Sequence, residues 1–235
     1  GDEILKQPFR PLLPDVKFLD FNEPQQLSDI TDQTACVMAE TIQGEAGVIA
    51  PENDFLKKLR KRCDETGTLL ILDEIQCGIG RTGKMFAFEQ YGIVPDILCL
   101  GKGLGGGMPI GCFASSQALM RTLSDKPALG HITTFGGHPL SCAAAFSTLE
   151  ILTSQKDLLS DLGSKSDKIV QRVGRVRRVK HVRKAGLLIA VEFETRDENF
   201  RMIEHLLHLG FITDWLLLND KSLRIAPPLT ITEEE

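Results

Sequence analysis

The stretch ILCLGKGLGGGMPIG, residues 97–111, joins an apolar run to a cluster of glycines that contains Lys102. A second apolar run, residues 69–72, ends in Asp73 and Glu74. Short apolar runs of this kind are typical of buried strands in a parallel sheet. A lysine and an aspartate that each follow such a strand are expected to face one pocket. Enzymes that hold a pyridoxal ring need these two groups, an amine for the aldehyde and an anion for the ring nitrogen.

The composition limits the classes of function open to the chain. With 235 residues, 42% of them hydrophobic, the chain can bury one large core, or a large and a small one. A net charge of −5 gives no overall attraction to nucleic acid or to an anionic membrane. No apolar run has the length that spans a bilayer, and the amino end has no signal-peptide pattern. We therefore expect a small-molecule substrate, with neither nucleic acid nor a membrane as partner.

The six cysteines form no CxxC pair, and most of them lie in apolar stretches. We interpret them as buried small hydrophobic residues rather than as disulfide partners or zinc ligands, and no metal site is predicted. Unpaired cysteines are typical of a reducing compartment, so the expected location is cytoplasmic. They are Cys36, Cys63, Cys77, Cys99, Cys112 and Cys142.

Strand and helix patterns alternate along the chain and predict an α/β fold with a mostly parallel sheet flanked by helices. Strands are expected at residues 35–40, 69–73, 96–100 and 112–115, with an amphipathic helix at 51–65. A helical pattern starts at Pro139 and continues in broken form to Val173. The remainder predicts strands at 179–182, 187–194 and 222–225 and a helix at 199–209.

These patterns divide the chain into three parts. Residues 1–150 are expected to form part of a large domain, 151–174 a connecting helix, and 175–235 a small, truncated carboxyl-terminal α/β domain. Residues 1–15 show no clear element, and residues 230–235 have the capping threonine and the acids of a helix start. Both ends therefore predict that the chain is part of a longer one.

Five motifs, in this order along the chain, resemble the class III pyridoxal-phosphate aminotransferases of fold type I. That family includes ornithine, acetylornithine and 4-aminobutyrate aminotransferases. The resemblance runs from about Pro11 to the end, so the chain corresponds to the larger, carboxyl-terminal part of such an enzyme. The motifs are ETIQGEAGV (40–48), ILDEIQCGIGRTG (71–83), LGKGLGGGMPIG (100–111), TTFGGHPLSCAAA (133–145) and LRIAPPLTIT (223–232).

The resemblance implies pyridoxal 5'-phosphate as cofactor and gives three residues a role toward it. Lys102 would form the aldimine and move the proton between substrate Cα and cofactor C4′. Asp73 would pair with the pyridinium nitrogen, and Gln76 would contact the ring hydroxyl. The alternatives are a surface lysine in a glycine turn, a helix N-cap and a polar turn residue, respectively. Glu74 is expected to point away from the ring.

Three more residues receive roles from the resemblance. Thr134 would reach the cofactor phosphate of a neighbouring subunit, which implies a homodimer with shared active sites. Arg224 would bind a substrate carboxylate in bidentate fashion, and Glu45 would neutralise that arginine when the substrate presents an uncharged amine end. The alternative for Glu45 and Arg224 is a structural ion pair between domains. Three departures from the family pattern leave substrate preference open: Thr41, Cys77 and His138.

Residues 101–106 also match the GxGxxG pattern of dinucleotide-binding proteins, and Asp125 follows at a suitable spacing. A nucleotide-binding oxidoreductase is therefore an alternative function. Pro109 argues against it, because proline falls where the helix of that motif should be running, at a cost of about 3 kcal/mol. The basic segment 172–184 is interpreted as the solvated face of a small-domain element, because valines interleave with its charges.

The predicted function is that of an aminotransferase. An amino acid or ω-amine would give its amino group, through the Lys102 aldimine, to an α-keto acid such as 2-oxoglutarate, with ping-pong kinetics. A catalytically incomplete fragment is the other alternative, because the family's phosphate cup lies upstream of this sequence. The sequence does not identify the amino donor.

Overall fold

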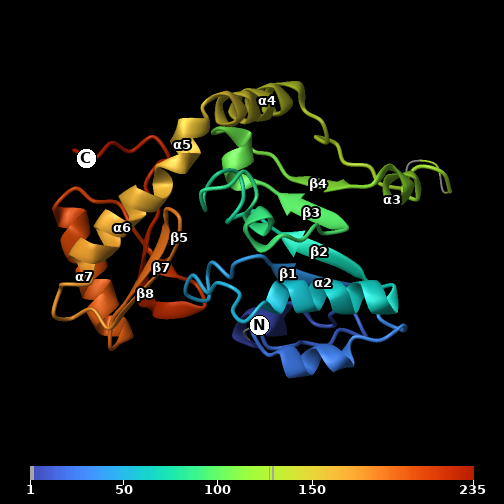
Figure 1. Cartoon of the computed structure of the whole chain (residues 1–235), viewed down its shortest axis with the longest axis horizontal. Helices are drawn as coiled ribbons and strands as arrows, with labels where there is room; N and C mark the ends of the chain where they lie inside the picture. Colours follow the sequence, from blue (N-terminus) through green and yellow to red (C-terminus); the bar gives the residue numbers. More distant parts are fainter. Residues whose placement is uncertain (1–2, 127, 129) are drawn as a thin grey trace.

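The computed structural model describes residues 3–126, 128 and 130–235. Two four-stranded sheets lie side by side, and three helices run from the first sheet to the second (Figure 1). The strand order is β1-β2-β3-β4 in the first sheet and β5-β6-β8-β7 in the second. The molecule is thus α/β, as predicted. Among the described residues, no helix is long and apolar enough to cross a membrane.

The first sheet contains the strands predicted in the first half of the chain. β1 (Cys36–Glu40), β2 (Leu69–Asp73) and β3 (Ile97–Leu100) are parallel, and β4 (Cys112–Ser115) runs antiparallel to β3. The sheet is therefore mostly parallel, as predicted, with β4 as its one antiparallel strand. Just the glycine-rich stretch 101–111 joins β3 to β4, and a parallel return needs a longer crossover connection.

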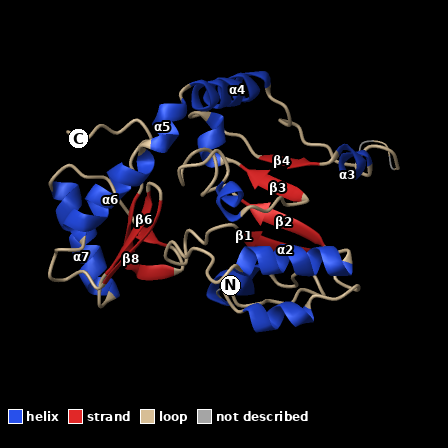
Figure 2. Ribbon diagram, in the orientation of Figure 1, coloured by secondary structure: helices blue, strands red, loops and turns tan. Residues whose placement is uncertain are grey.

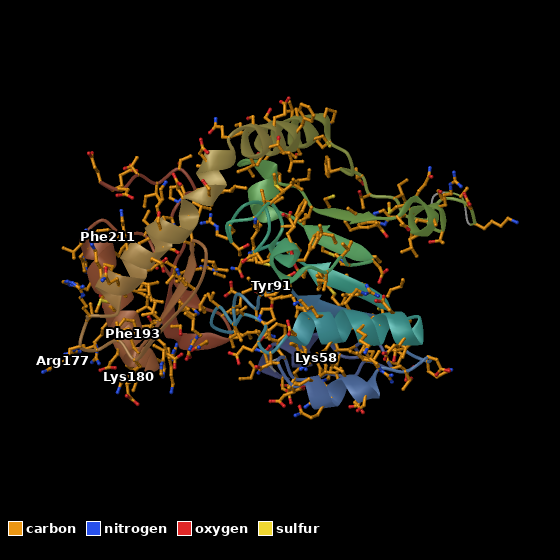
Figure 3. The ribbon with its side chains drawn as sticks, viewed as in Figure 1. Lys58, Tyr91, Arg177, Lys180, Phe193 and Phe211 are labelled. Carbon is orange, nitrogen blue, oxygen red and sulfur yellow. The ribbon has the colours of Figure 1, made fainter. Side chains whose placement is uncertain are left out.

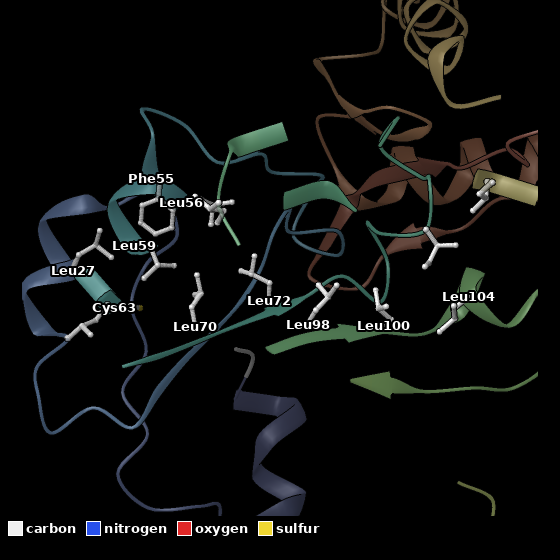
Figure 4. Close-up of a cluster of buried hydrophobic side chains, with 14 of the residues drawn as sticks. Leu27, Phe55, Leu56, Leu59, Cys63, Leu70, Leu72, Leu98, Leu100 and Leu104 are labelled. Atoms are coloured by element: carbon white, nitrogen blue, oxygen red, sulfur yellow. The ribbon is translucent and has the colours of Figure 1, made fainter. Parts of the chain in front are cut away.

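The core of this sheet forms between β2 and helix α2 (Phe55–Thr66). Leu70 and Leu72 are fully buried and pack with Leu56 and Leu59 of the helix (Figure 4). Alternate side chains of a strand lie on one face, and the apolar stripe of an amphipathic helix covers that face. The helix begins later than predicted, because the residues before it, Asn53 and Asp54, have φ of 49° and 57°, outside the helical region.

The opposite face of the first sheet is more open than expected. Met38 of β1 is 61% exposed, so this strand is not covered on both faces as its apolar sequence predicted. The expectation of buried cysteines is also wrong at three positions: Cys36, Cys112 and Cys142 are exposed, whereas Cys63 and Cys77 are buried. Strand edges and helix surfaces provide these exposed places, which short apolar runs do not reveal. All six cysteines are free.

Helices α4 (Pro139–Ser154), α5 (Lys156–Ser160) and α6 (Leu162–Val173) form the broken helical connection that was predicted (Figure 2). The second sheet is antiparallel throughout. Ile189, Val191 and Leu223 form its core, against α6 and α7. Its elements are β5 (His181–Ala185), β6 (Leu188–Glu192), α7 (Arg196–His208), β7 (Trp215–Leu216) and β8 (Asn219–Ile225).

Several short elements differ from expectation. The first strand of the second sheet begins at His181 rather than 179, and β7 was not predicted. Within residues 1–15, α1 (Glu3–Lys6) forms one helical turn. Residues 230–235 form no helix, although Thr232 and Glu235 exchange the hydrogen bonds of a capping box. The remaining short helices are α3 (Gln117–Arg121), η1 (Gln7–Phe9), η2 (Pro24–Asp29), η3 (Ala87–Tyr91) and η4 (Lys102–Gly105).

Candidate active site

The carboxyl ends of β1, β2 and β3 bring the predicted cofactor residues to one edge of the first sheet. Glu40, the last residue of β1, pairs in register with Asp73, the last residue of β2. Asp73 pairs in turn with Cys99, three positions before Lys102. Lys102 has φ of 42°, in the left-handed region, at the start of the 3-10 helix η4. Parallel strands thus place a carboxylate and an amine at the edge where α/β proteins bind ligands.

Glu40 ends the strand next to Asp73, and the charges of Asp73 and Lys102 shift its pKa in opposite directions. Burial raises the pKa of the Glu40 carboxyl, the Gly44 N–H that it accepts at 3.0 Å lowers that pKa, Asp73 raises it, and the Lys102 ammonium lowers it. The net shift of the Glu40 pKa is upward, with burial as its largest cause. Glu40 was not predicted as a site residue. Its position at a strand end beside Asp73 is the signal that identifies it.

Glu74 makes buried hydrogen bonds within the first sheet and the loop beside it. It is fully buried, and its carboxylate accepts hydrogen bonds of 2.7 Å from the Thr41 hydroxyl and from the backbone N–H groups of Ala87 and Phe88. Burial raises the pKa of Glu74, and these hydrogen bonds oppose the rise. Glu74 therefore joins the end of β1 to the loop after β2.

A cavity of about 920 Å³ opens beside Lys102, between the first sheet and the second. Lys102 and Gln76 line it from the first sheet, and Arg224 lines it from β8. Lys102 is exposed. Asp73 lies outside the lining of this cavity. Its Oδ1 accepts the Ile75 N–H at 2.9 Å.

Glu45 and Arg224 are in direct contact. Arg224 Nη1 donates to Glu45 Oε1 at 2.7 Å, and Gln76 Nε2 donates to the same oxygen at 2.9 Å. Glu45 Oε2 accepts the backbone N–H of Leu217 at 2.8 Å. The pair lines the cavity and also joins the first sheet to the β7–β8 hairpin. Gly44 lies beside it, and a Cβ there would lie 1.7 Å from Gln76 Oε1, so a larger residue would force the Gln76 side chain to move.

Two further charged residues belong to this region. Asp214 accepts from Arg224 Nε at 3.0 Å and from Arg224 Nη2 at 2.5 Å. Arg81 lines the cavity, and its Nη1 donates to the backbone carbonyls of Leu187 and Pro227 at 3.3 and 2.6 Å. Burial lowers the pKa of Arg81. Neither residue was predicted, since the Arg81 contacts join segments far apart in the sequence and Asp214 lies in no recognisable motif.

Thr134 lies away from this cavity. It is exposed in the turn between α3 and α4, and Thr133 beside it is also exposed. The chain therefore does not bring Thr134 to its own Lys102.

The dinucleotide alternative fails on geometry. After β3 the glycines form the four-residue 3-10 helix η4 instead of the long helix that a GxGxxG motif requires.

The basic segment 172–184 lies at the second sheet, and Figure 3 shows its Arg177 and Lys180 projecting outward. Val173, Val179 and Val182 pack against the core of that sheet, as the interleaved pattern predicted.

Comparisons with known proteins agree with the sequence resemblance. The sequence profile of the family aminotransferase class-III matches residues 2–235. A curated relative, putrescine aminotransferase from Pectobacterium atrosepticum, is 43% identical over 244 residues, which cover 98% of this chain and 52% of the relative.

Two solved structures show the same fold. Ornithine aminotransferase from Toxoplasma gondii, with PLP at partial occupancy in its active site, has a TM-score of 0.85 and 34% identity, over 97% of this chain and 54% of that one. N-acetylornithine aminotransferase from Stenotrophomonas maltophilia has a TM-score of 0.79 and 32% identity, over 93% and 58%. The chain thus spans about half the length of the proteins that it matches.

Proposed function

Since the chain belongs to the class III aminotransferases, we propose that it forms the lysine side of an aminotransferase active site. The whole protein would move an amino group from an amino acid or ω-amine donor to an α-keto acid, 2-oxoglutarate in the first instance. One observation carries this proposal: Lys102 shares a cavity with Gln76, Glu45 and Arg224, and Asp73 ends the neighbouring strand.

The residues present fit pyridoxal phosphate at its aldehyde and ring-nitrogen ends. Among the described residues, neither Lys102 nor Asp73 takes part in an ion pair, so each charge is available to a bound group. When bound, the cofactor supplies an aldehyde and an electron-accepting ring. Lys102 Nζ would hold the aldehyde carbon and later carry the proton released from substrate Cα. Asp73 would keep a proton on the ring nitrogen, and Gln76 would orient the ring hydroxyl.

Arg224 and Glu45 would bind the end of the substrate that does not react. A guanidinium matches a carboxylate in bidentate geometry. The Glu45 contact is a single hydrogen bond to Nη1, and Glu45 also accepts from Gln76 and Leu217. Glu45 can therefore leave Arg224 when a keto acid enters and return when the substrate end is an amine.

The homodimer is part of the same proposal. Thr134 would reach the cofactor phosphate in the partner subunit, which fits its exposed place away from the chain's own cavity. Large apolar side chains around it are exposed, including Phe135 at 79%, Leu140 at 65% and Phe146 at 63%. Large apolar side chains exposed in one segment of the chain support an interface there. We also retain a cytoplasmic location, which six free cysteines favour.

The test is a kinetic screen of amine donors with 2-oxoglutarate, in the complete protein with pyridoxal phosphate. The name of the putrescine aminotransferase relative supports including diamines beside ornithine and 4-aminobutyrate. We expect turnover of at least one donor, with the parallel double-reciprocal lines of a ping-pong mechanism. Absence of turnover for every donor, in protein that binds the cofactor, would contradict the proposed function.

A further inference from the structure

Arg224 contacts two carboxylates at once, and only one of them lines the cavity. Nη1 donates to Glu45, while Nε and Nη2 donate to the two oxygens of Asp214. Asp214 therefore fills the Nε/Nη2 edge of the guanidinium in the bidentate geometry that a substrate carboxylate would use. A substrate carboxylate has only the Nη1/Nη2 edge left, where Glu45 already binds.

Asp214 makes more hydrogen bonds to Arg224 than Glu45 does. Both residues have their backbone bonded to the β7–β8 hairpin: the Arg224 N–H donates to the Asp214 carbonyl at 2.9 Å, and the Leu218 N–H donates to the Glu45 carbonyl at 3.1 Å. The Asp214 carboxylate accepts two hydrogen bonds from the Arg224 guanidinium, and Glu45 accepts one. A substrate carboxylate that replaces Glu45 therefore breaks one hydrogen bond of the guanidinium, whereas replacing Asp214 breaks two.

Asp214 changes the charge at Arg224 itself. The Arg224 guanidinium with its two carboxylate partners carries a formal charge of +1 − 2 = −1, whereas the guanidinium with Glu45 alone would carry zero. Asp214 therefore reduces the attraction of Arg224 for a substrate carboxylate. Arg81 also lines the cavity, and its Nη1 donates to two backbone carbonyls.

We propose that Asp214 is a specificity-determining residue, which weakens the binding of a substrate carboxylate at Arg224 and favours amino donors whose far end is an amine, such as aliphatic diamines. This inference rests on the proposed function for its substrates. It goes beyond that function by naming the donor class and the residue that selects it.

The kinetic experiment compares two donors that differ only at the far end, 1,4-diaminobutane and 4-aminobutyrate. In Asp214→Asn, the kcat/KM for the diamine divided by that for 4-aminobutyrate should fall, because the loss of the Asp214 charge leaves Arg224 freer to bind a carboxylate. We expect a change of about tenfold, which corresponds to about 1.4 kcal/mol. Asp214→Glu, which keeps the charge, should restore most of the ratio. Asp220→Asn is the matched control, since Asp220 lies on the same hairpin and pairs with Arg196 instead.

A binding measurement separates this inference from the proposed function. Calorimetric titration of the cofactor-loaded protein with glutarate needs no turnover. Glutarate should bind about tenfold more tightly to Asp214→Asn than to the wild type or to Asp220→Asn. If the wild-type protein transaminates no donor but glutarate binding tightens as stated, the inference survives and the proposed function fails. If glutarate affinity and the donor ratio are the same in Asp214→Asn and Asp220→Asn, the inference is wrong.

Discussion

Arg224 is the residue on which the proposed substrate binding depends. In Arg224→Ala, the KM for 2-oxoglutarate should rise by about 10- to 100-fold, because charge-assisted hydrogen bonds of about 1.5–3 kcal/mol are lost. Steady-state kinetics at saturating donor measure this. Arg196→Ala serves as control, because Arg196 is exposed and pairs with Asp220. An unaltered KM in Arg224→Ala would remove the arginine from the substrate site.

The Glu45 carboxylate should make the free energy of unfolding depend on pH. Burial raises the pKa of its carboxyl, but hydrogen bonds from the Leu217 N–H, Gln76 and Arg224 lower that pKa by more, so the net shift is downward. A carboxyl whose pKa is lower in the folded state stabilises the fold above its ordinary pKa of 4.5 and loses that contribution as the pH falls through the folded value.

Glu45→Gln should therefore lower the free energy of unfolding by about 1–2 kcal/mol at pH 7, and by less below about pH 4. Urea denaturation of both proteins across this pH range measures the difference. A difference that stays constant down to pH 3 would mean that the Glu45 charge does not contribute.

Some site residues could be predicted from the sequence, and others could be recognised only in the fold. Lys102 and Gln76 lie in short motifs whose place after a strand fixes their position, and both line the cavity. Glu45 and Arg224 are far apart in the sequence, and only the fold shows that they touch. Asp214 follows no motif, because its role comes from hydrogen bonds to one side chain across a hairpin.

At the scale of elements, the junction of β1 and β2 depends on a buried hydrogen bond. The Thr41 hydroxyl donates to Glu74 at 2.7 Å. Thr41→Val keeps the shape but leaves the buried carboxylate with one donor fewer, so the free energy of unfolding should fall by about 1–3 kcal/mol. Thr41→Ser keeps the donor and should lose less. Equal losses in urea denaturation would show that the hydroxyl does not matter.

Elements were predictable where one residue pattern decided them. β2 matches its predicted bounds because five residues alternate between a buried and a partly exposed face. The helix after β1 starts late because of two left-handed residues, Asn53 and Asp54, that the apolar periodicity does not reveal. The direction of β4 was not predictable from its apolar run, since it depends on the length of the connection.

At the scale of the whole molecule, the exposed apolar surface around Thr134 predicts a homodimer. Sedimentation equilibrium of the complete protein should give twice the subunit mass. Phe146→Asp, on α4, introduces a charge at a side chain that is 63% exposed, so it should shift the protein toward the monomer with little change in the subunit's own fold. A monomeric wild-type protein, or a Phe146→Asp dimer of unchanged affinity, would contradict this surface as the interface.

Lys102 is the residue proposed to hold the cofactor, and chemical mapping tests this role without any assay of turnover. The protein is incubated with pyridoxal phosphate, reduced with borohydride and digested, and the phosphopyridoxyl group is located by mass spectrometry. We predict the label on Lys102, its loss in Lys102→Ala, and its retention in Lys84→Ala, which changes an exposed lysine of a neighbouring glycine loop. If Lys102→Ala still carries the label at wild-type stoichiometry, on any other lysine, then Lys102 is not the residue that holds the cofactor.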